Sequence, residues 1–598
     1  MTRARLAAAL VVALAVAVHA PSLGGSFLLD DGVQIYKNRA VTAGAPLSAW
    51  FLDRGTTSSR ADYNTRIYRP LRNLAFRAVV LVAGVRPLAF GVVNLALYAL
   101  SALFVLALLL RLTGDERAAA WATALWVVLP VHVEPVVYCS ALGDQLSLAL
   151  ELGAVVVAVD FVRDGGAVRA AASTALAAAA MLAKEMAVTE PALVVLVAVA
   201  VTGTDGPNRT RRAWALAAAH GVVALAYVAL RTHVVGAVGQ EPITGASLAI
   251  GLRDAPWLLA HYLWISVAPL GHAASYRVAP PGALALVATL AAIAATFAVA
   301  WRTRRVAAVG LAWFALSLVP VLHLVPLWAD LADRFALFPS VGLALALAAA
   351  LVPWRRRAPL VLGALVVVYA AASVVEARPW RNDSLLWRYA VDRQPNAPLA
   401  RSNLAAVLLG EGRLDEAAAQ LEALHAMGYT RADTEVKRAY VLSRLGRSDE
   451  ALHASSAALT LDSANGVAHA IAGGLWLGRG DTAAATRLFS SARLLAPTHP
   501  ATGLLGYELQ HADDARVDYL RALVALAFDD ADGAARSARA CLQRAPSQPQ
   551  CEAALGEALT LQGPLDGQAR VLLDRCVATM PEGPDRARCR EARWGARR

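Results

Sequence analysis

Residues 90–110 read FGVVNLALYALSALFVLALLL, a run without a single charged side chain. A helix of about twenty such residues covers the roughly 30 Å hydrocarbon core of a bilayer. Comparable runs recur from residue 6 to about 377, and none reaches that length afterwards. The whole chain, 598 residues with 58% apolar side chains and a mean hydropathy of +0.48, is too apolar for a soluble protein of this size. The sequence therefore predicts an all-α protein with a polytopic membrane domain, 1–377, and a second domain, 378–598.

The apolar runs predict about eleven membrane spans. The first segment, MTRARLAAALVVALAVAVHA, also has the features of a signal peptide, but an uncleaved first span is favoured because many spans follow. The stretch 257–270 is expected to be re-entrant or interfacial. The other expected spans lie near 90–110, 118–131, 144–162, 168–184, 187–202, 213–230, 282–301, 307–326, 339–353 and 359–376.

Arginine clusters predict the orientation of these spans. The net charge of +11 belongs to the membrane half, because residues 378–598 are nearly balanced, and this argues against nucleic-acid binding. With a cytoplasmic N-terminus, every cluster falls on the cytoplasmic side, as the positive-inside rule requires. The large first loop, 22–88, and everything after 377 are then extracytoplasmic, in a multi-pass inner-membrane protein. The clusters are Arg111 and Arg117, Arg163 and Arg169, Arg209–Arg212, Arg302–Arg305 and Arg355–Arg357.

The second domain repeats with a period of 34 residues. The strings GRLDEA, GRSDEA and GDTAAA begin at 412, 446 and 480, and small or apolar residues recur in phase with them. A Gly turn, small residues where two helices touch and a Pro after the second helix resemble the tetratricopeptide repeat. Looser units end at Pro546 and Pro581. Such repeats stack into an α-solenoid whose concave surface binds peptides or proteins.

Four of the five cysteines lie near the C-terminus. Cys541 and Cys576 fall in second helices of the looser units, and Cys551 and Cys589 fall in the helices that follow. Bridges Cys541–Cys551 and Cys576–Cys589 would join neighbouring helices in an oxidising compartment, although free thiols and other pairings remain open.

Acidic side chains gather at the external ends of the spans. The first are Asp30 and Asp31 in FLLDDGVQIY, where the chain leaves an apolar run. Each one singly could be a solvated loop residue, but together with cations on the same face they predict an external pocket. A carboxylate there could deprotonate an acceptor hydroxyl, and the cations could stabilise a departing lipid phosphate. The acids are Asp30, Asp31, Glu134, Asp144, Glu185, Asp330 and Asp333, and the bases are Arg69, Lys184, Arg231 and Arg334, with His132 alongside.

Several motifs in fixed order resemble one family of membrane enzymes. They are FLLDDGVQIYKN, YRPLRNLAF, VLPVHVEPVVYCSALGDQLS, LAKEMAVTEPAL and LVPLWADLADRFALFPSVG, followed by the repeats. Nearly the whole chain is similar to the transmembrane and tetratricopeptide-containing O-mannosyltransferases of the GT-C superfamily, in a bacterial version. The resemblance implies a polyprenyl-phosphate sugar donor, inversion at the anomeric carbon, an external active site and no metal or other cofactor.

The resemblance also assigns roles to individual residues. The acidic pair matches Asp30 and Asp31, one of which would be the base; the two should point opposite ways in extended chain, and Asp30 is slightly favoured. The remaining matches are His132 with Glu134, Lys184 with Glu185, and Asp333 with Arg334, although His132 and Glu134 could instead cap a helix end. Phe335 stands where the family often has Tyr, which puts a hydroxyl role there in doubt.

Other functions remain open at this point. The protein could be a GT-C transferase that modifies an envelope glycan or lipid, or a membrane-anchored scaffold without catalysis. A transporter is disfavoured because the membrane half shows no internal repeat and its acids cluster at one face. The sugar, the acceptor, the lipid length and the oligomeric state are not specified by the sequence.

Overall fold

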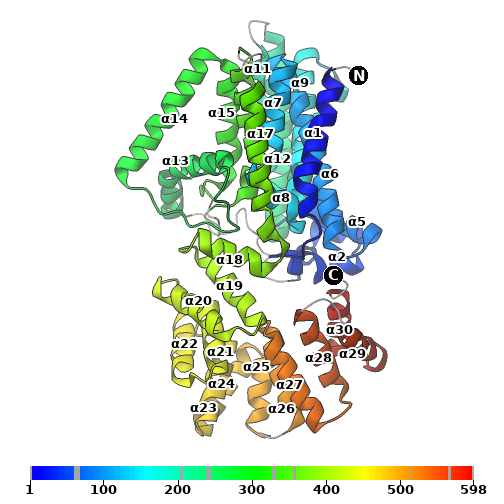
Figure 1. Cartoon of the computed structure of the whole chain (residues 1–598), viewed down its shortest axis with the longest axis vertical. Helices are drawn as coiled ribbons and strands as arrows, with labels where there is room; N and C mark the ends of the chain where they lie inside the picture. Colours follow the sequence, from blue (N-terminus) through cyan, green and yellow to red (C-terminus); the bar gives the residue numbers. More distant parts are fainter. Residues whose placement is uncertain are drawn as a thin grey trace. The chain divides into compact units, whose positions relative to one another are not determined.

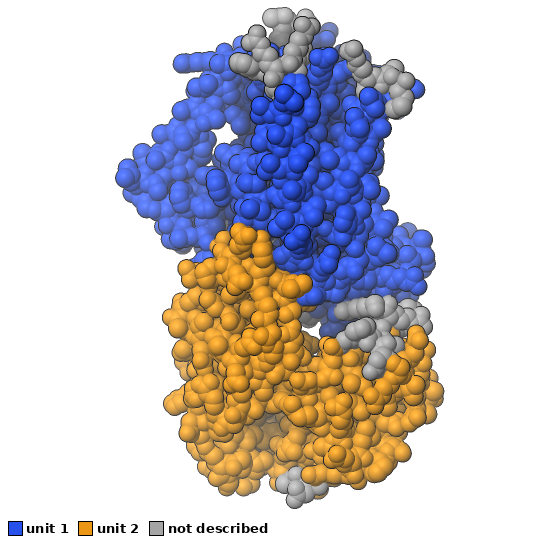
Figure 2. Space-filling model, viewed as in Figure 1, with its two compact units in different colours: residues 1–382 blue, residues 383–598 orange. Residues whose placement is uncertain are grey.

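A computed structural model describes residues 3–59, 67–202, 207–236, 244–325, 327, 331–353, 359–511, 514–562 and 567–595. Every regular element among these residues is a helix, so the predicted all-α fold class is confirmed (Figure 1). The chain divides into two compact units, 1–382 and 383–598 (Figure 2). The expected domain boundary at 377 lies just before this division, and Asp330 lies outside the described residues.

The first unit is a bundle of apolar helices. Among the described residues, six of its helices are long and apolar enough to cross a membrane, or seven if the pair α7 and α8, bent by 58°, forms one broken span. The long helices are α1 (Arg3–His19), α6 (Pro87–Thr113), α9 (Leu142–Asp164), α12 (Pro207–Val235), α14 (Ala283–Thr303) and α17 (Pro359–Glu376), and the bent pair is α7 (Glu116–Val127) and α8 (Val133–Val137).

Seven of the eleven expected spans meet this criterion if the bent pair counts as one, and the count of eleven stays a prediction. Four expected spans are helices of 12–17 residues: α10 (Ala167–Ala183), α11 (Glu190–Thr202), α15 (Arg305–Leu318) and α16 (Ser340–Leu351). At 1.5 Å per residue the lengths described for these helices are below about 30 Å, although about 17 residues can be enough for a span. The description of α11 stops at residue 202, so its full length is not part of this comparison.

Small residues bring two of these short helices into close contact. Gly310 in α15 faces Gly342 in α16, and a Cβ at either position would collide with the backbone of the other helix. Small residues at such crossings let membrane helices approach closely. The α15–α16 contact therefore fixes the start of α16, which follows the Asp333–Arg334 segment directly.

The stretch expected to be re-entrant belongs to α13 (Gly245–Val267), which contains Pro256. This helix does not meet the length and apolarity required of a span. In Figure 1 it lies at a large angle to α15 and α17. The loop that follows, 268–282, returns toward the segment around Asp333.

The segment between α1 and α6 folds onto the bundle around its own apolar core. Its helices are η2 (Gly32–Tyr36), α2 (Arg39–Ala43), α3 (Leu47–Leu52), η3 (Arg54–Thr56) and α5 (Pro70–Ala83). Ile35, Trp50 and Phe76 are buried against Phe90 at the start of α6. Burying one such side chain contributes about 1.5–3 kcal/mol. Phe27 is buried in the same core, so the loop is anchored on both sides of Asp30 and Asp31.

The second unit consists of stacked helical hairpins. The repeat pattern places each Gly in a turn with positive φ: 72° at Gly412, 74° at Gly446 and 82° at Gly480. The in-phase residues Ala417, Ala451 and Ala485 are fully buried, as the repeat predicts. The helices are α18 (Asp383–Arg393), α19 (Pro398–Gly410), α20 (Leu414–Ala426), α21 (Ala432–Arg444), α22 (Ser448–Leu461), α23 (Gly466–Gly478), α24 (Thr482–Leu495), α25 (Pro500–Glu508), α26 (Ala515–Ala527), α27 (Ala531–Arg544), α28 (Pro549–Gln562), α29 (Gly567–Thr579) and α30 (Pro584–Gly595).

Both cysteine pairs form bridges in the structure. Cys541 in α27 is joined to Cys551 in α28, and Cys576 in α29 to Cys589 in α30. Cys139 is buried outside these two bridges, and its thiol donates to the Pro87 carbonyl oxygen at 3.7 Å. Of the pairings left open by the sequence, the structure shows the one between successive helices.

Candidate active site

The two acids at the start of the site have different surroundings. Asp31 is fully buried and accepts hydrogen bonds from the backbone N–H groups of Leu28 and Ser140, both at 2.8 Å, and from the Ser140 hydroxyl at 2.5 Å. Burial raises the pKa of Asp31 to about 7. The hydrogen bonds oppose this shift, because each of them lowers the pKa. Asp31 therefore fastens the loop to the residues before α9.

Asp30 is only partly buried, and its carboxylate faces a different neighbour. Gln34 Nε2 lies 3.4 Å from Asp30 Oδ2, and Gln34 Oε1 accepts a 2.9 Å hydrogen bond from the buried Arg72. The Asp30 backbone N–H donates to the Tyr138 hydroxyl at 3.2 Å. Of the two acids, Asp30 is the more exposed residue.

The expected extended conformation of this pair is wrong. Leu29 has a φ of +50°, and Asp31 is helical and directly precedes η2. A tight turn, not the alternation of a strand, separates the two carboxylates. A side chain with positive φ is disfavoured, so the surrounding contacts hold this turn in place.

Glu134 and Arg334 form a buried ion pair across the bundle. The Arg334 guanidinium contacts Glu134, and the Arg334 backbone N–H donates to Glu134 Oε2 at 3.0 Å. The Arg334 side chain is 20% exposed and that of Glu134 is 2% exposed, so only the arginine is accessible. Phe335 lies between two cations, with Arg334 and the Lys184 ammonium each 5.1 Å from its ring centre. A phenyl face at this position suits cation–π contacts and needs no hydroxyl.

Two further ion pairs lie beside this one. Lys184 contacts Asp144, and both side chains are less than a tenth exposed. Arg69 contacts Glu185 through two hydrogen bonds of 2.5 and 2.7 Å, with side chains 15% and 29% exposed. Arg231 is buried and acts electrostatically on Glu185. Electrostatic contacts of Asp144 with both Arg69 and Arg334 join the pairs into one cluster.

His132 does not reach this cluster. It is fully buried and forms hydrogen bonds with the Tyr98 hydroxyl at 2.8 Å and the Ser340 hydroxyl at 2.9 Å. Trp126 also donates to Ser340 at 2.9 Å. His132 thus ties α6 and α7 to the start of α16, next to the segment that carries Arg334.

Asp333 is held by two residues that the sequence reasoning missed. His272 Nδ1 lies 2.8 Å from Asp333 Oδ2, and the Tyr276 hydroxyl donates to Asp333 Oδ1 at 2.6 Å. His272 and Tyr276 belong to the loop 268–282, and all three side chains are buried. In the sequence only a weak signal indicates these two residues. They are a His and a Tyr in the short loop GHAASY, which follows a stretch rich in aromatic residues.

We predict a pH dependence of stability from this contact. Burial alone would lower the pKa of His272, but the Asp333 carboxylate raises it to about 9, above the ordinary value of about 6.5. A raised pKa stabilises the folded state fully below pH 6.5, and this contribution, about 3 kcal/mol, is lost as the pH rises through 9. Unfolding of the full chain between pH 6 and 10 should show this loss, and His272→Gln should remove most of it. Equal pH dependence in the two proteins would contradict the ion pair.

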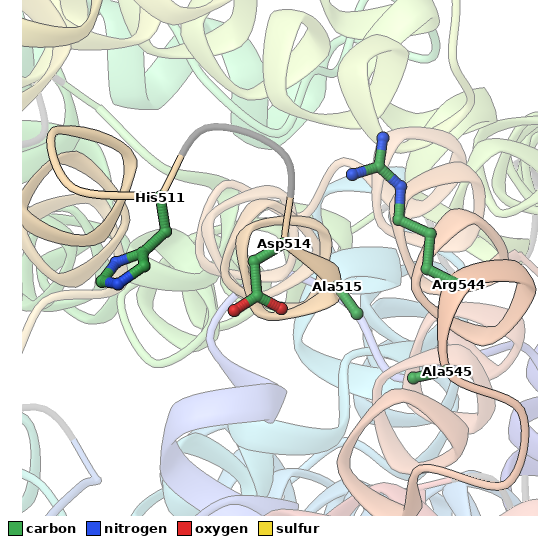
Figure 3. A pocket seen from close by; sticks show the side chains of 5 residues that line it. All are labelled: His511, Asp514, Ala515, Arg544 and Ala545. Atoms are coloured by element: carbon green, nitrogen blue, oxygen red, sulfur yellow. The ribbon is translucent and has the colours of Figure 1, made fainter.

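A separate cavity lies in the second unit. Its volume is about 910 Å³, and it is lined by His511, Asp514, Ala515, Arg544 and Ala545. Figure 3 shows His511 and Asp514 on one side of it and Arg544 with Ala545 on the other. None of these residues belongs to the predicted catalytic set. The cavity is therefore lined by an acidic side chain, Asp514, and a basic one, Arg544, at the surface of the repeat unit.

The fold and the buried ion pairs define a multi-helical membrane protein with an appended helical-repeat unit, and sequence comparison adds distant relatives. No family model matches the chain. It is 33% identical over 153 residues to a mouse protein (Mus musculus) and 32% identical over 149 residues to a human protein (Homo sapiens), both named Protein O-mannosyl-transferase TMTC1. It is 29% identical over 146 residues to mouse Protein O-mannosyl-transferase TMTC3.

These matches cover a small part of each protein. They span 24% of this chain and 16–17% of the length of the relatives. A crystal structure of a tetratricopeptide repeat protein from Parabacteroides merdae also aligns, at 14% identity, covering 38% of this chain and 94% of that protein, with a TM-score of 0.20. That superposition is too loose to compare the two folds in detail. The similarity to O-mannosyl-transferases is thus distant and partial.

Proposed function

We propose that this protein is a membrane glycosyltransferase. It transfers a mannose-like sugar from a polyprenyl-phosphate donor to the hydroxyl of Ser or Thr in exported proteins, at the extracytoplasmic face, with inversion. Distant similarity to protein O-mannosyl-transferases supports the class of reaction. The observation that carries the proposal is a partly exposed acid, Asp30, linked to a cluster of buried ion pairs whose arginines remain partly exposed. The links are the Tyr138 hydroxyl, which accepts from the Asp30 N–H and interacts electrostatically with Arg334, and Gln34 with Arg72, which interacts electrostatically with Arg69.

In this reaction Asp30 is the general base. It takes the proton of the acceptor hydroxyl while the hydroxyl oxygen attacks the anomeric carbon, and the bond from that carbon to the phosphate oxygen breaks. The products are a glycosylated acceptor and polyprenyl phosphate. The Gln34 amide, held by Arg72, orients the Asp30 carboxylate, and Asp31 holds the turn.

Exposure indicates which cations contact the donor phosphate. Arg334 and Arg69 keep 20% and 15% of their side chains exposed, whereas Lys184 keeps 6%. The two arginines are therefore the phosphate ligands, since a guanidinium can bind a phosphate oxygen and a carboxylate at once through different N–H groups. Lys184, Asp144, Glu134 and Glu185 fix their positions.

The repeat unit binds the acceptor in this proposal. Stacked helical hairpins commonly present a surface for a peptide or protein. The cavity at His511, Asp514 and Arg544 is one polar contact site on that unit. Two disulfide bridges support an oxidising, extracytoplasmic location for it.

A comparison of cells with and without the gene tests the function. Mass spectrometry of exported proteins and of envelope lipids should show hexose on Ser or Thr that disappears on deletion and returns with the wild-type gene but not with an Asp30→Asn gene. A hexose lost from lipids or glycans, with exported proteins unchanged, would assign the enzyme a different acceptor. No change in any fraction would count against a transferase.

A further inference from the structure

A second group of ionisable side chains lies inside the helical bundle. It is distinct from the ion pairs of Arg334, Lys184 and Arg69. Glu190 and His220 are fully buried, and Glu151 is 3% exposed. They come from α11, α12 and α9, and His220 is near the middle of the 29-residue α12. Charged groups at such depth are costly and usually mark a functional site.

The hydrogen bonds around His220 determine which of its nitrogens carries a proton. The Ser173 hydroxyl donates to the Ala154 carbonyl at 2.9 Å, so its oxygen must accept from His220 Nε2, which lies 3.2 Å away. Nε2 therefore carries hydrogen. In a neutral histidine, Nδ1 then carries a lone pair and no hydrogen.

That lone pair faces a carboxyl group. His220 Nδ1 lies 3.7 Å from Glu190 Oε2, and neither Glu190 oxygen has a hydrogen bond within the described residues. A lone pair opposite a carboxylate is repulsive, and an unpaired carboxylate in an apolar interior is costly. One additional proton, on the carboxyl group or on Nδ1, removes both problems.

Among the described residues, no cation acts electrostatically on Glu190. Glu151 is a second acid that acts electrostatically on Glu190, and it accepts a hydrogen bond from Ser147 at 2.7 Å. The α15 helix, which also packs on α11, carries no titratable side chain after Arg305 at its first residue. No three His, Cys, Asp or Glu side chains among the described residues are arranged as metal ligands.

We propose that Glu190 and His220, with Glu151 beside them, form a proton-binding site inside the membrane bundle. The neutral pair, with the proton on Glu190, is favoured over an ion pair because the surroundings are apolar: Ala158, Val194, Leu216 and Ala217 form the adjacent core. Glu151 also lies within electrostatic reach of Lys184 and Asp144. This inference does not depend on the chemistry of sugar transfer.

Carbodiimide labelling of the full-length protein in lipid nanodiscs tests the site. Dicyclohexylcarbodiimide enters apolar regions, and an undissociated carboxylic acid adds across its C=N bond to give an acylisourea that rearranges to a stable acylurea, with no leaving group. Peptide mapping should find this adduct on Glu190, decreasing at high pH. Asp160 is the matched control, because it lies on α9 but pairs with Arg111 at 2.8 Å, and it should not react. No adduct on Glu190, in a digest that recovers its peptide, overturns the proposal.

Stability against pH gives a second measurement. In the proposal the folded protein holds one proton at Glu190, whereas an exposed Glu of the unfolded chain has lost its proton above about pH 4.3. The unfolding equilibrium of the wild type should therefore shift about tenfold per pH unit toward the unfolded state, for as long as the folded protein keeps that proton. Glu190→Gln is permanently neutral and should lack this component, whereas Asp160→Asn should keep it. Equal slopes in all three proteins overturn the proposal; if Glu190→Gln does not fold, the labelling of the wild type decides.

Discussion

Replacing Asp30 with Asn is expected to lower the rate of sugar transfer by about two to four orders of magnitude, with donor affinity almost unchanged. A general base acts on the proton only in the transition state, so its loss reduces turnover far more than binding. Asn keeps the size of Asp and can still contact Gln34, 3.4 Å away, but it cannot accept a proton. Single-turnover transfer and donor binding, measured on the same purified variant, separate the two effects.

Asp31→Asn is the matched control for this experiment. Asp31 is fully buried and accepts three hydrogen bonds, from Leu28 and Ser140, so the amide is expected to destabilise the loop more than it slows a correctly folded enzyme. If the large rate effect falls on Asp31→Asn instead, Asp31 is the base. Near wild-type transfer in both stable variants would exclude the acidic pair as the source of the base.

Replacing Arg334 with Ala is expected to weaken donor binding by about one to two orders of magnitude, since a hydrogen bond to a charged group contributes roughly 1.5–3 kcal/mol. The same change leaves Glu134, 2% exposed, without its partner, and breaking a buried pair in this way costs about 3–5 kcal/mol of stability. Donor titration and thermal unfolding of the variant measure the two losses separately.

The double variant Glu134→Gln with Arg334→Ala distinguishes the two effects. Removing the carboxylate charge should restore much of the lost stability but none of the donor affinity. Arg334→Lys should restore part of both, since an ammonium keeps the charge but not the planar set of N–H donors. Full donor affinity in a stable Arg334→Ala protein would show that this arginine does not bind the phosphate.

Much of the architecture could be predicted from the sequence because its signals are periodic or long. The 34-residue repeat correctly placed Gly412, Gly446 and Gly480 in turns and Ala417 and Ala451 in the core. The number of helices in the membrane half could also be predicted from the sequence, but the lengths of these helices could not. The expected span 168–184, for example, is a helix of 17 residues, and hydropathy alone does not determine such a length.

The candidate site was predictable as a set of residues but not as a set of contacts. The sequence places Glu134, Lys184 and Arg334 at the same ends of their helices. Which acid meets which base depends on how the helices cross, and adjacent residues differ: Lys184 pairs with Asp144, while Glu185 pairs with Arg69.

Other partners lie outside any motif recognised in the sequence. His272 and Tyr276 were missed because their role arises only when the loop 268–282 folds back onto Asp333. The turn at Leu29 was misjudged because its positive φ is imposed by the buried neighbours of Asp31 and not by its own sequence.

Transfer by the purified protein is the most direct test of the central claim. The full chain is reconstituted in vesicles with a polyprenyl phosphate carrying radiolabelled mannose and an acceptor peptide rich in Ser and Thr. The account predicts label on the peptide hydroxyls, in the anomeric configuration opposite to that of the donor, with wild type but not with Asp30→Asn. Label that stays on the lipid with active, folded protein, across peptides and exported proteins offered as acceptors, would contradict it.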